Sequence, residues 1–193
     1  MNISAFLVYC AVMAITPGPN NLMCLYLGAS GGFRRLVRFF CGSMTGLFVK
    51  CALCGLLNVL LAEKIPVVVP YLKWLGALYM VYLAFGMVRS GLKEEDETGS
   101  GEGTFRSGIL LQVLNVKSWV AALSIFSVYV IPFTTAVGAI VLSAFTFTFF
   151  CAVASTLWCG FGAAIQKIYH RFRLPLSIVF ALTLVYCAWS AVR

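Results

Sequence analysis

Residues 4–27 read SAFLVYCAVMAITPGPNNLMCLYL, an apolar stretch that is interrupted near its middle by Thr16-Pro17-Gly18-Pro19-Asn20-Asn21. Its length suits a membrane-spanning helix, which needs about 20 apolar residues. Two prolines around a glycine remove two backbone N–H donors, so a regular helix cannot continue through them. Because unpaired carbonyls are costly in lipid, such a break is expected inside the protein or beside a water-filled cavity. The alternative is a plain proline kink.

Five further apolar stretches of similar length follow the first. They cover residues 37–61, 66–88, 108–130, 136–165 and 175–192. Apolar residues make up 62% of the chain and charged residues 10%, with a mean hydropathy of +0.98. Ordinary soluble domains are about half apolar and a quarter charged. The predicted fold class is therefore an all-α integral membrane protein with six transmembrane helices, for which the lipid bilayer is the main partner.

The polar stretch 89–106 separates the third apolar stretch from the fourth and contains most of the acidic residues of the chain. We interpret residues 91–106 as a cytoplasmic linker within a single transporter domain of all 193 residues. The linker divides this domain into repeats at 1–90 and 107–193. Three helices in each half place the halves in opposite orientations, which predicts two inverted three-helix repeats with helices 1 and 4 broken.

Basic residues are unevenly distributed between the two sides that six spans would create. With the N-terminus outside, nine Lys and Arg residues fall on the cytoplasmic side and three on the outer side. Basic residues are enriched in cytoplasmic loops, so both termini are predicted to lie outside the cytoplasmic membrane. The net charge is +8, but it is divided into short clusters between apolar stretches, which argues against nucleic acid as a partner.

A second polar interruption, Asn115-Val116-Lys117-Ser118, lies in the fourth stretch at a place that corresponds to the first break. Asn and Lys are expensive in lipid and usually face the protein interior. Paired interruptions in two halves indicate a substrate site, where the helix that resumes after Pro19 directs free N–H groups at a carboxylate. For Lys117 an alternative stays open, in which the fourth span begins later and the amine reaches the cytoplasmic headgroups.

Lys50 lies near the middle of the second stretch, far from either end. Three explanations are open. The buried amine exchanges its proton during transport, or it makes a structural bond to backbone carbonyls of the broken helix, or the boundary of the stretch is misplaced. We include Lys50 in the candidate site under the first explanation.

No nucleotide-binding loop, Ser/His/Asp set, HExxH motif or metal-ligand cluster occurs in the sequence, so neither an enzyme nor a cofactor is expected. The eight cysteines lie within apolar stretches and act as small apolar residues. They leave two competing functions open, a membrane thiol–disulfide electron carrier and a metal or inorganic-ion exporter. The spacing Gly42-x-x-x-Gly46 predicts close helix packing within the chain and also leaves a homodimer open.

The strings around the two interruptions resemble those of a known family. Ile15-Thr16-Pro17-Gly18-Pro19-Asn20-Asn21, Gly32-Phe33-Arg34, Gly42-x-x-x-Gly46 and Leu114-Asn115-Val116-Lys117 are similar to motifs of the lysine exporter (LysE/RhtB) family. They look most like its cysteine and O-acetylserine exporter branch, and the similarity in length and segment plan covers the whole chain. The resemblance implies a small secondary transporter that exports amino acids or close derivatives, driven by the proton gradient.

By position in these motifs, the resemblance implies a substrate site formed by Thr16, Pro17, Gly18, Pro19, Asn20, Asn21, Asn115 and Lys117. Lys50 departs from the branch, in which an apolar residue is expected at this position. A cation in the pocket would favour a more acidic or carboxylate-bearing cargo.

Overall fold

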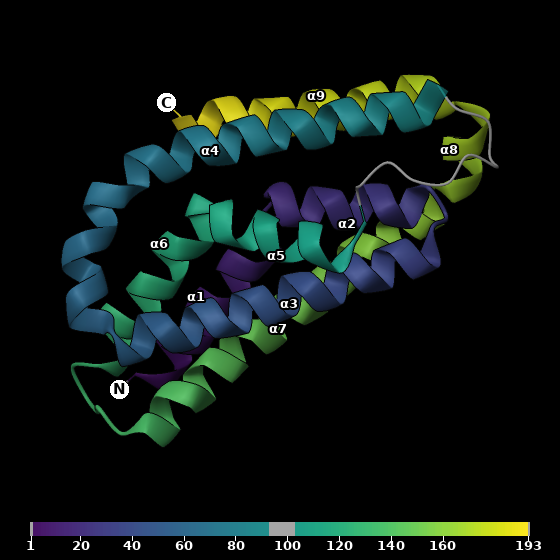
Figure 1. Ribbon diagram of the computed structural model, residues 1–193. Coiled ribbons are helices and arrows are strands. Elements are labelled where there is room, and N and C mark those ends of the chain that lie inside the picture. Colours follow the sequence, from purple (N-terminus) through teal and green to yellow (C-terminus); the bar gives the residue numbers. More distant parts are fainter. Residues whose placement is uncertain (1, 93–102, 193) are drawn as a thin grey trace.

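The computed structural model describes residues 2–92 and 103–192, and these residues are almost entirely helical (Figure 1). The first half comprises α1 (Ile3–Ile15), α2 (Pro19–Ala29), α3 (Phe33–Leu56) and α4 (Asn58–Leu92). The second half comprises α5 (Phe105–Leu114), α6 (Val116–Ser124), the π-helical segment η1 (Ile125–Val130), α7 (Val137–Ala164), α8 (Gln166–Arg171) and α9 (Arg173–Val192). No strand occurs among the described residues.

Six membrane spans can be drawn through these helices. Four are α3, α7, α9 and the part of α4 from Pro70 to Leu92, each long and apolar enough to cross a bilayer. The other two are bent pairs, with an angle of 52° between α1 and α2 and of 65° between α5 and the helix formed by α6 and η1. The all-α prediction with helices 1 and 4 broken is therefore confirmed.

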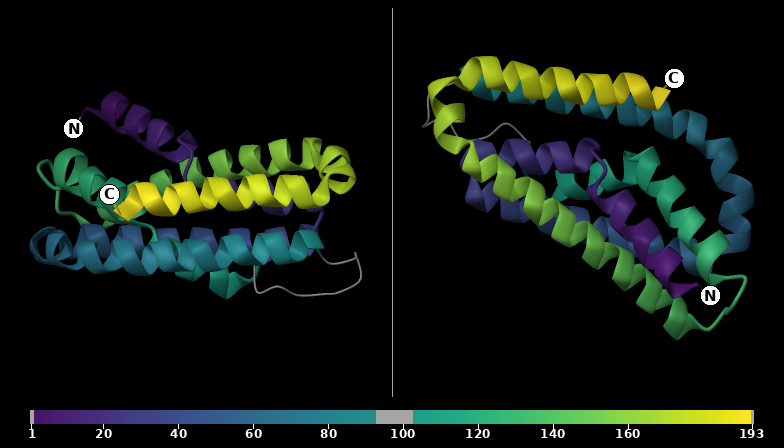
Figure 2. Two further views of the ribbon diagram at one scale, coloured as in Figure 1. Left: turned by 90° about the horizontal axis from the view of Figure 1, so that it is seen from above. Right: turned by 180° about the vertical axis from the view of Figure 1, so that it is seen from behind.

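The helices form two groups (Figure 1). α4 and α9, the third span of each half, lie side by side and antiparallel along one edge of the molecule. The remaining spans pack together beside them, with α2 against α7 and α5 against α3. Both chain ends lie toward one end of the molecule, and α8 lies at the other (Figure 2).

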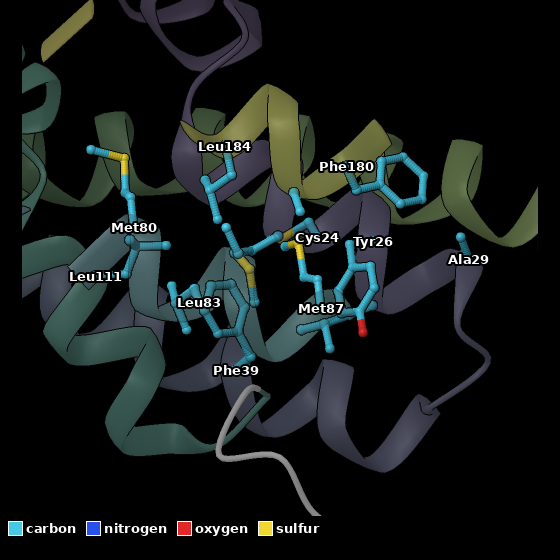
Figure 3. Close-up of a cluster of buried hydrophobic side chains, with 14 of the residues drawn as sticks. Cys24, Tyr26, Ala29, Phe39, Met80, Leu83, Met87, Leu111, Phe180 and Leu184 are labelled. Atoms are coloured by element: carbon cyan, nitrogen blue, oxygen red, sulfur yellow. The ribbon is translucent and has the colours of Figure 1, made fainter. Parts of the chain in front are cut away.

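Buried side chains join the two groups of helices at the end near α8. Cys24 and Tyr26 of α2 belong to one buried cluster with Leu83 and Met87 of α4 and Leu184 of α9 (Figure 3). The full cluster also draws on α3 and α5. Because these apolar side chains pack on one another, they exclude water from the space between the two groups of helices at that end.

Glycines let the shorter half-helices approach the long helices closely. A Cβ atom added at Gly42 of α3 would collide with the carbonyl oxygen of Phe105, and one added at Gly108 of α5 with that of Phe39. The same relation holds between α2 and α7, where Gly28 lies against the Cys159 carbonyl and Gly162 against the Leu25 carbonyl. The predicted packing role of Gly42 within the chain is thus confirmed.

The predicted boundary between the second and third spans is wrong. The sequence placed a loop between 37–61 and 66–88, but α3 ends at Leu56 and α4 continues from Asn58 to Leu92. The polar pair Glu63-Lys64 indicated a loop, yet the backbone is helical through both residues.

Helices also occupy both ends of the predicted linker at 91–106. α4 extends to Leu92 and α5 begins at Phe105, with Thr104 as its N-cap. The acidic part of the linker falls in residues 93–102, outside the described residues.

Candidate helix-break site

The first break leaves several carbonyls without helical partners, among them those of Thr16 and Pro17. α1 ends at Ile15 and is capped by Thr16, whose backbone N–H donates to the carbonyl of Val12 at 3.1 Å, and α2 begins after the extended residue Gly18. Pro17 and Pro19 lack N–H groups, which fits the position of Pro19 at the start of α2. The carbonyls of Thr16 and Pro17 therefore face partners from elsewhere in the chain.

Asn20 and Asn21 fix the first break from the start of α2. The Asn21 side-chain amide donates to the carbonyl of Ala14 at 2.9 Å and to that of Thr16 at 3.2 Å. Asn20 donates to Ser155 Oγ of α7 at 3.1 Å and accepts a hydrogen bond from Ser43 Oγ of α3. Both asparagines are buried. They tie the break to its own helix and to two neighbouring spans.

The second break, at Asn115, contains no proline. Asn115 has φ −80° and ψ 97°, which separates α5 from α6. Its carbonyl accepts the Ser118 hydroxyl at 2.8 Å. The indole N–H of Trp119 donates to the carbonyl of Val113 at 2.7 Å. Side chains thus satisfy the carbonyls that the end of α5 leaves free.

Lys117 brings the two breaks together. Its ammonium donates to the Thr16 carbonyl at 2.7 Å and to the Pro17 carbonyl at 3.4 Å, although these residues are about a hundred positions away in the sequence. Its side chain also lies over Gly18, where an added Cβ would be 3.4 Å from Lys117 Cδ. The amine is therefore bound to the first break, and the alternative in which it reaches the headgroups is wrong.

Lys50 reaches the second break from α3. Its ammonium donates to the Gln112 carbonyl at 2.8 Å and to Ser118 Oγ. Although α3 ends at Leu56, Lys50 is buried and its ammonium faces the second break, so a misplaced boundary does not explain it. The contacts are those of a bond to backbone carbonyls of a broken helix, which was one of the three explanations.

Two cavities adjoin the breaks and share Gly18, Asn115 and Lys117 in their walls. The smaller has a volume of about 40 Å³ and is lined by polar side chains that include Asn20 and Gln112. The larger has a volume of about 340 Å³ and extends from the breaks to α4 and α9. Small-molecule sites usually measure about 300–1,000 Å³, so only the larger cavity has room for a whole cargo molecule.

A family model described as the LysE type translocator matches residues 11–192. The chain belongs to this family of translocators. It is 36% identical over 190 residues to the cysteine/O-acetylserine efflux proteins of Escherichia coli (strain K12) and Shigella sonnei (strain Ss046), covering 96% of this chain and 95% of each relative. No solved structure matches it. The protein is a multi-pass membrane transporter and not an enzyme.

In this LysE-type translocator, all of the site residues expected from the sequence lie at the two breaks except Lys50. Lys50 lies on α3 and contacts the second break on a side that faces neither cavity. Gly18, Asn20, Asn21, Asn115 and Lys117 line one or both cavities. Pro17 and Pro19 line the larger cavity only, and Thr16 contributes its carbonyl to Lys117. Lys50 lines neither cavity, so direct contact with cargo, as first expected, does not fit its position.

Three site residues were not expected from the sequence. Ser43 and Ser155 hold Asn20, but single serines are too common in membrane helices to be noticed. Lys73 falls within the third predicted stretch, 66–88, but was counted only as an outer-side charge, whereas it lies in α4 and lines the larger cavity. Helical spacing puts Lys73 on one face with Gly76 and Met80, which line the same cavity, and this spacing was the signal that could have found it.

Proposed function

We propose that this LysE-type translocator exports amino acids or close derivatives across the cytoplasmic membrane as a secondary transporter driven by the proton gradient. The observation that carries the proposal is the cavity of about 340 Å³ bordered by both helix breaks. The names of the relatives, cysteine/O-acetylserine efflux proteins, support cargo of this size and chemistry.

The breaks offer partners for both charged groups of a zwitterion. A cargo carboxylate at the Lys117 ammonium would also face the start of α2, where the backbone N–H groups of Asn20 and Asn21 have no helical acceptor. A cargo ammonium needs acceptors, and Gln112 Oε1 is a buried oxygen without a hydrogen-bond partner among the described residues. Gln112 lines the smaller cavity, whose volume suits an ammonium group but not a whole amino acid.

In this pose the cargo side chain occupies the larger cavity. Its walls there are Met80 of α4, Leu114 of α5 and Cys187 of α9, which are apolar, together with Ser190. A short side chain such as that of cysteine or O-acetylserine fits between them. Because these wall residues are apolar or carry a hydroxyl, they can contact a thiol or an ester of the cargo side chain and do not require a charged one.

The proposed orientation in the membrane rests on the charge distribution. Arg34, Arg35 and Arg38 lie at the start of α3, toward the end of the molecule that carries α8. With the basic end in the cytoplasm, both termini lie outside. The larger cavity is lined by the early part of the α4 span and the last turns of α9, so it lies toward the outer face.

The test is uptake into inside-out vesicles with an imposed pH gradient, using cysteine, O-acetylserine, threonine, homoserine and lysine. We expect at least one compound to accumulate and the accumulation to stop when a protonophore is added. Asn20→Ala should reduce it strongly, whereas Asn58→Ala, which removes a hydrogen bond to Ser127 away from both cavities, should not. Accumulation of none of the five compounds, or transport of metal ions instead, would contradict the proposal.

A further inference from the structure

Lys50 carries a buried charge that the cargo cavities do not explain. Its side chain is only 4% exposed and lines neither cavity. A cation in such a place is costly unless acceptors surround it. Within residues 2–92 and 103–192, the acceptors are a carbonyl and a hydroxyl rather than a carboxylate. The ammonium must therefore be held by the dipoles around it.

These dipoles belong to both halves of the second broken helix. Gln112, whose carbonyl accepts the ammonium at 2.8 Å, lies in the last turn of α5, at the negative end of that helix. Ser118, whose hydroxyl is the second partner, lies in the first turn of α6. The Trp119 ring is 5.3 Å from the nitrogen and presents its π face to the charge. One ammonium thus bridges the end of α5 and the start of α6.

In transporters with broken helices, carbonyls exposed by the break and the C-terminal ends of half-helices are the groups that coordinate a coupling cation. We propose that Lys50 is a tethered cation, whose ammonium permanently occupies this cation position at the second break. The 65° bend between α5 and α6 is then held without a free metal ion. The inference rests on the proposed transport function, and it adds that the Lys50 ammonium holds the second break in the shape that the cargo site needs.

Lys50 acts on the cargo site through its partners. Ser118 also donates to the Asn115 carbonyl at 2.8 Å, and both residues line the smaller cavity. Gln112, whose backbone binds the ammonium, donates from its side chain to Ser43 Oγ at 3.0 Å, and Ser43 donates to Asn20. Removal of the ammonium would loosen groups that face the cargo from both breaks. Lys50 is a positioning residue, because it does not touch the cargo.

Two substitutions separate the charge of Lys50 from the space that it fills. Lys50→Met keeps most of the volume without the charge, whereas Lys50→Ala leaves a hole beside the Gln112 carbonyl. Methylammonium can enter such a hole and donate to the same acceptors, but it cannot enter when methionine fills the space. A merely structural side chain would not produce this difference between the two variants.

The first measurement is exchange of radiolabelled cysteine, kept reduced, across proteoliposomes without a pH gradient, so that a permeant amine cannot act by collapsing one. We expect both variants to exchange about 10- to 100-fold more slowly than the wild type, by analogy with the loss of groups that orient a metal ligand. Methylammonium should restore exchange to Lys50→Ala in a saturable manner and leave Lys50→Met and the wild type unchanged.

The second measurement does not depend on transport. Methylammonium should raise the thermal unfolding temperature of purified Lys50→Ala, because a ligand that binds only the folded state stabilises it, and it should not do so for Lys50→Met. Equal shifts in all three proteins, or no shift in Lys50→Ala, would overturn the tethered cation even if cysteine is not the cargo. A wild type that exchanges no amino acid, with the shift present, would count against the proposed function alone.

Discussion

The two helix breaks of this translocator are made in different ways. Two prolines impose the first break, between α1 and α2, because neither can supply the N–H that a continuous helix requires. The second break, between α5 and α6, has no proline and is held by side chains that bind its carbonyls: Lys50 on Gln112 and Trp119 on Val113. The first break is therefore fixed by its covalent structure, whereas the second depends on tertiary contacts.

The lysines at the two breaks also differ, in whether they can reach the cargo. Each break receives an ammonium from the other half of the chain, Lys117 at the first and Lys50 at the second. Lys117 lines both cavities, so a cargo carboxylate can compete with the Thr16 carbonyl for it. Lys50 is buried away from both. The comparison suggests a first break that exchanges partners with cargo and a second break that stays assembled.

The largest effect is expected from removing the first break. Replacing Pro17, Gly18 and Pro19 together by alanine allows α1 and α2 to merge, which moves Asn20 away from Ser43 and Ser155. Misplacement of a site by about 1 Å can cost about 100-fold in rate, so vesicle transport should fall by at least that factor. Pro175→Ala, in the first turn of α9, is the matched control and should transport normally. Normal transport by the triple variant would show that the break is not needed.

Lys117→Met should have the next largest effect. It removes the ammonium from the Thr16 and Pro17 carbonyls and from the cargo. We expect the KM for cargo to rise about 10-fold or more, the usual range for loss of a charged hydrogen-bond partner of 1.5–3 kcal/mol, with a smaller change in maximal rate. Lys117→Arg should recover part of the affinity. An unchanged KM would mean that cargo does not meet the first break.

The sequence predicted the first break well and the second break less securely, for a physical reason. Pro17-Gly18-Pro19 breaks a helix wherever it occurs, so local chemistry is sufficient. Asn115-Val116-Lys117-Ser118 is compatible with a regular helix, and its break depends on side-chain contacts that include the distant residue Lys50. The pairing of the two interruptions, rather than either string, was the informative signal.

The features that the sequence did not predict also depend on contacts between distant parts of the chain. Lys73 was counted as a charge on the outer side because charge was taken as a sign of the membrane surface, yet it lines a cavity beside both breaks. The helical structure at α8 and the π-helical turns of η1 depend on how the chain packs, and composition does not predict them. Lys50 was recognised as buried, but its partners lie more than sixty positions away on another span.

Trp119→Phe should produce a smaller effect that is specific to the second break. It keeps an aromatic ring near Lys50 and removes the N–H that binds the Val113 carbonyl. The loss of one hydrogen bond, about 1 kcal/mol, should lower transport about fivefold. Trp74→Phe, on an exposed face of α4, provides the control and should have no effect. If Trp119→Phe matches this control, the indole bond does not hold the second break.

The smallest effect is expected for Lys73, the cavity lysine that belongs to neither break. Lys73 has no hydrogen-bond or ion-pair partner among the side chains that the structure describes, so Lys73→Ala should leave the free energy of unfolding within about 0.5 kcal/mol of the wild type. Its charge can still attract a cargo carboxylate through space. The KM should therefore rise about two- to threefold at low salt, and the difference should shrink as ionic strength increases, because exposed charges are screened. A loss comparable to that of Lys117→Met, or one that salt leaves unchanged, would indicate direct binding at Lys73 and would extend the cargo site beyond the two breaks onto α4.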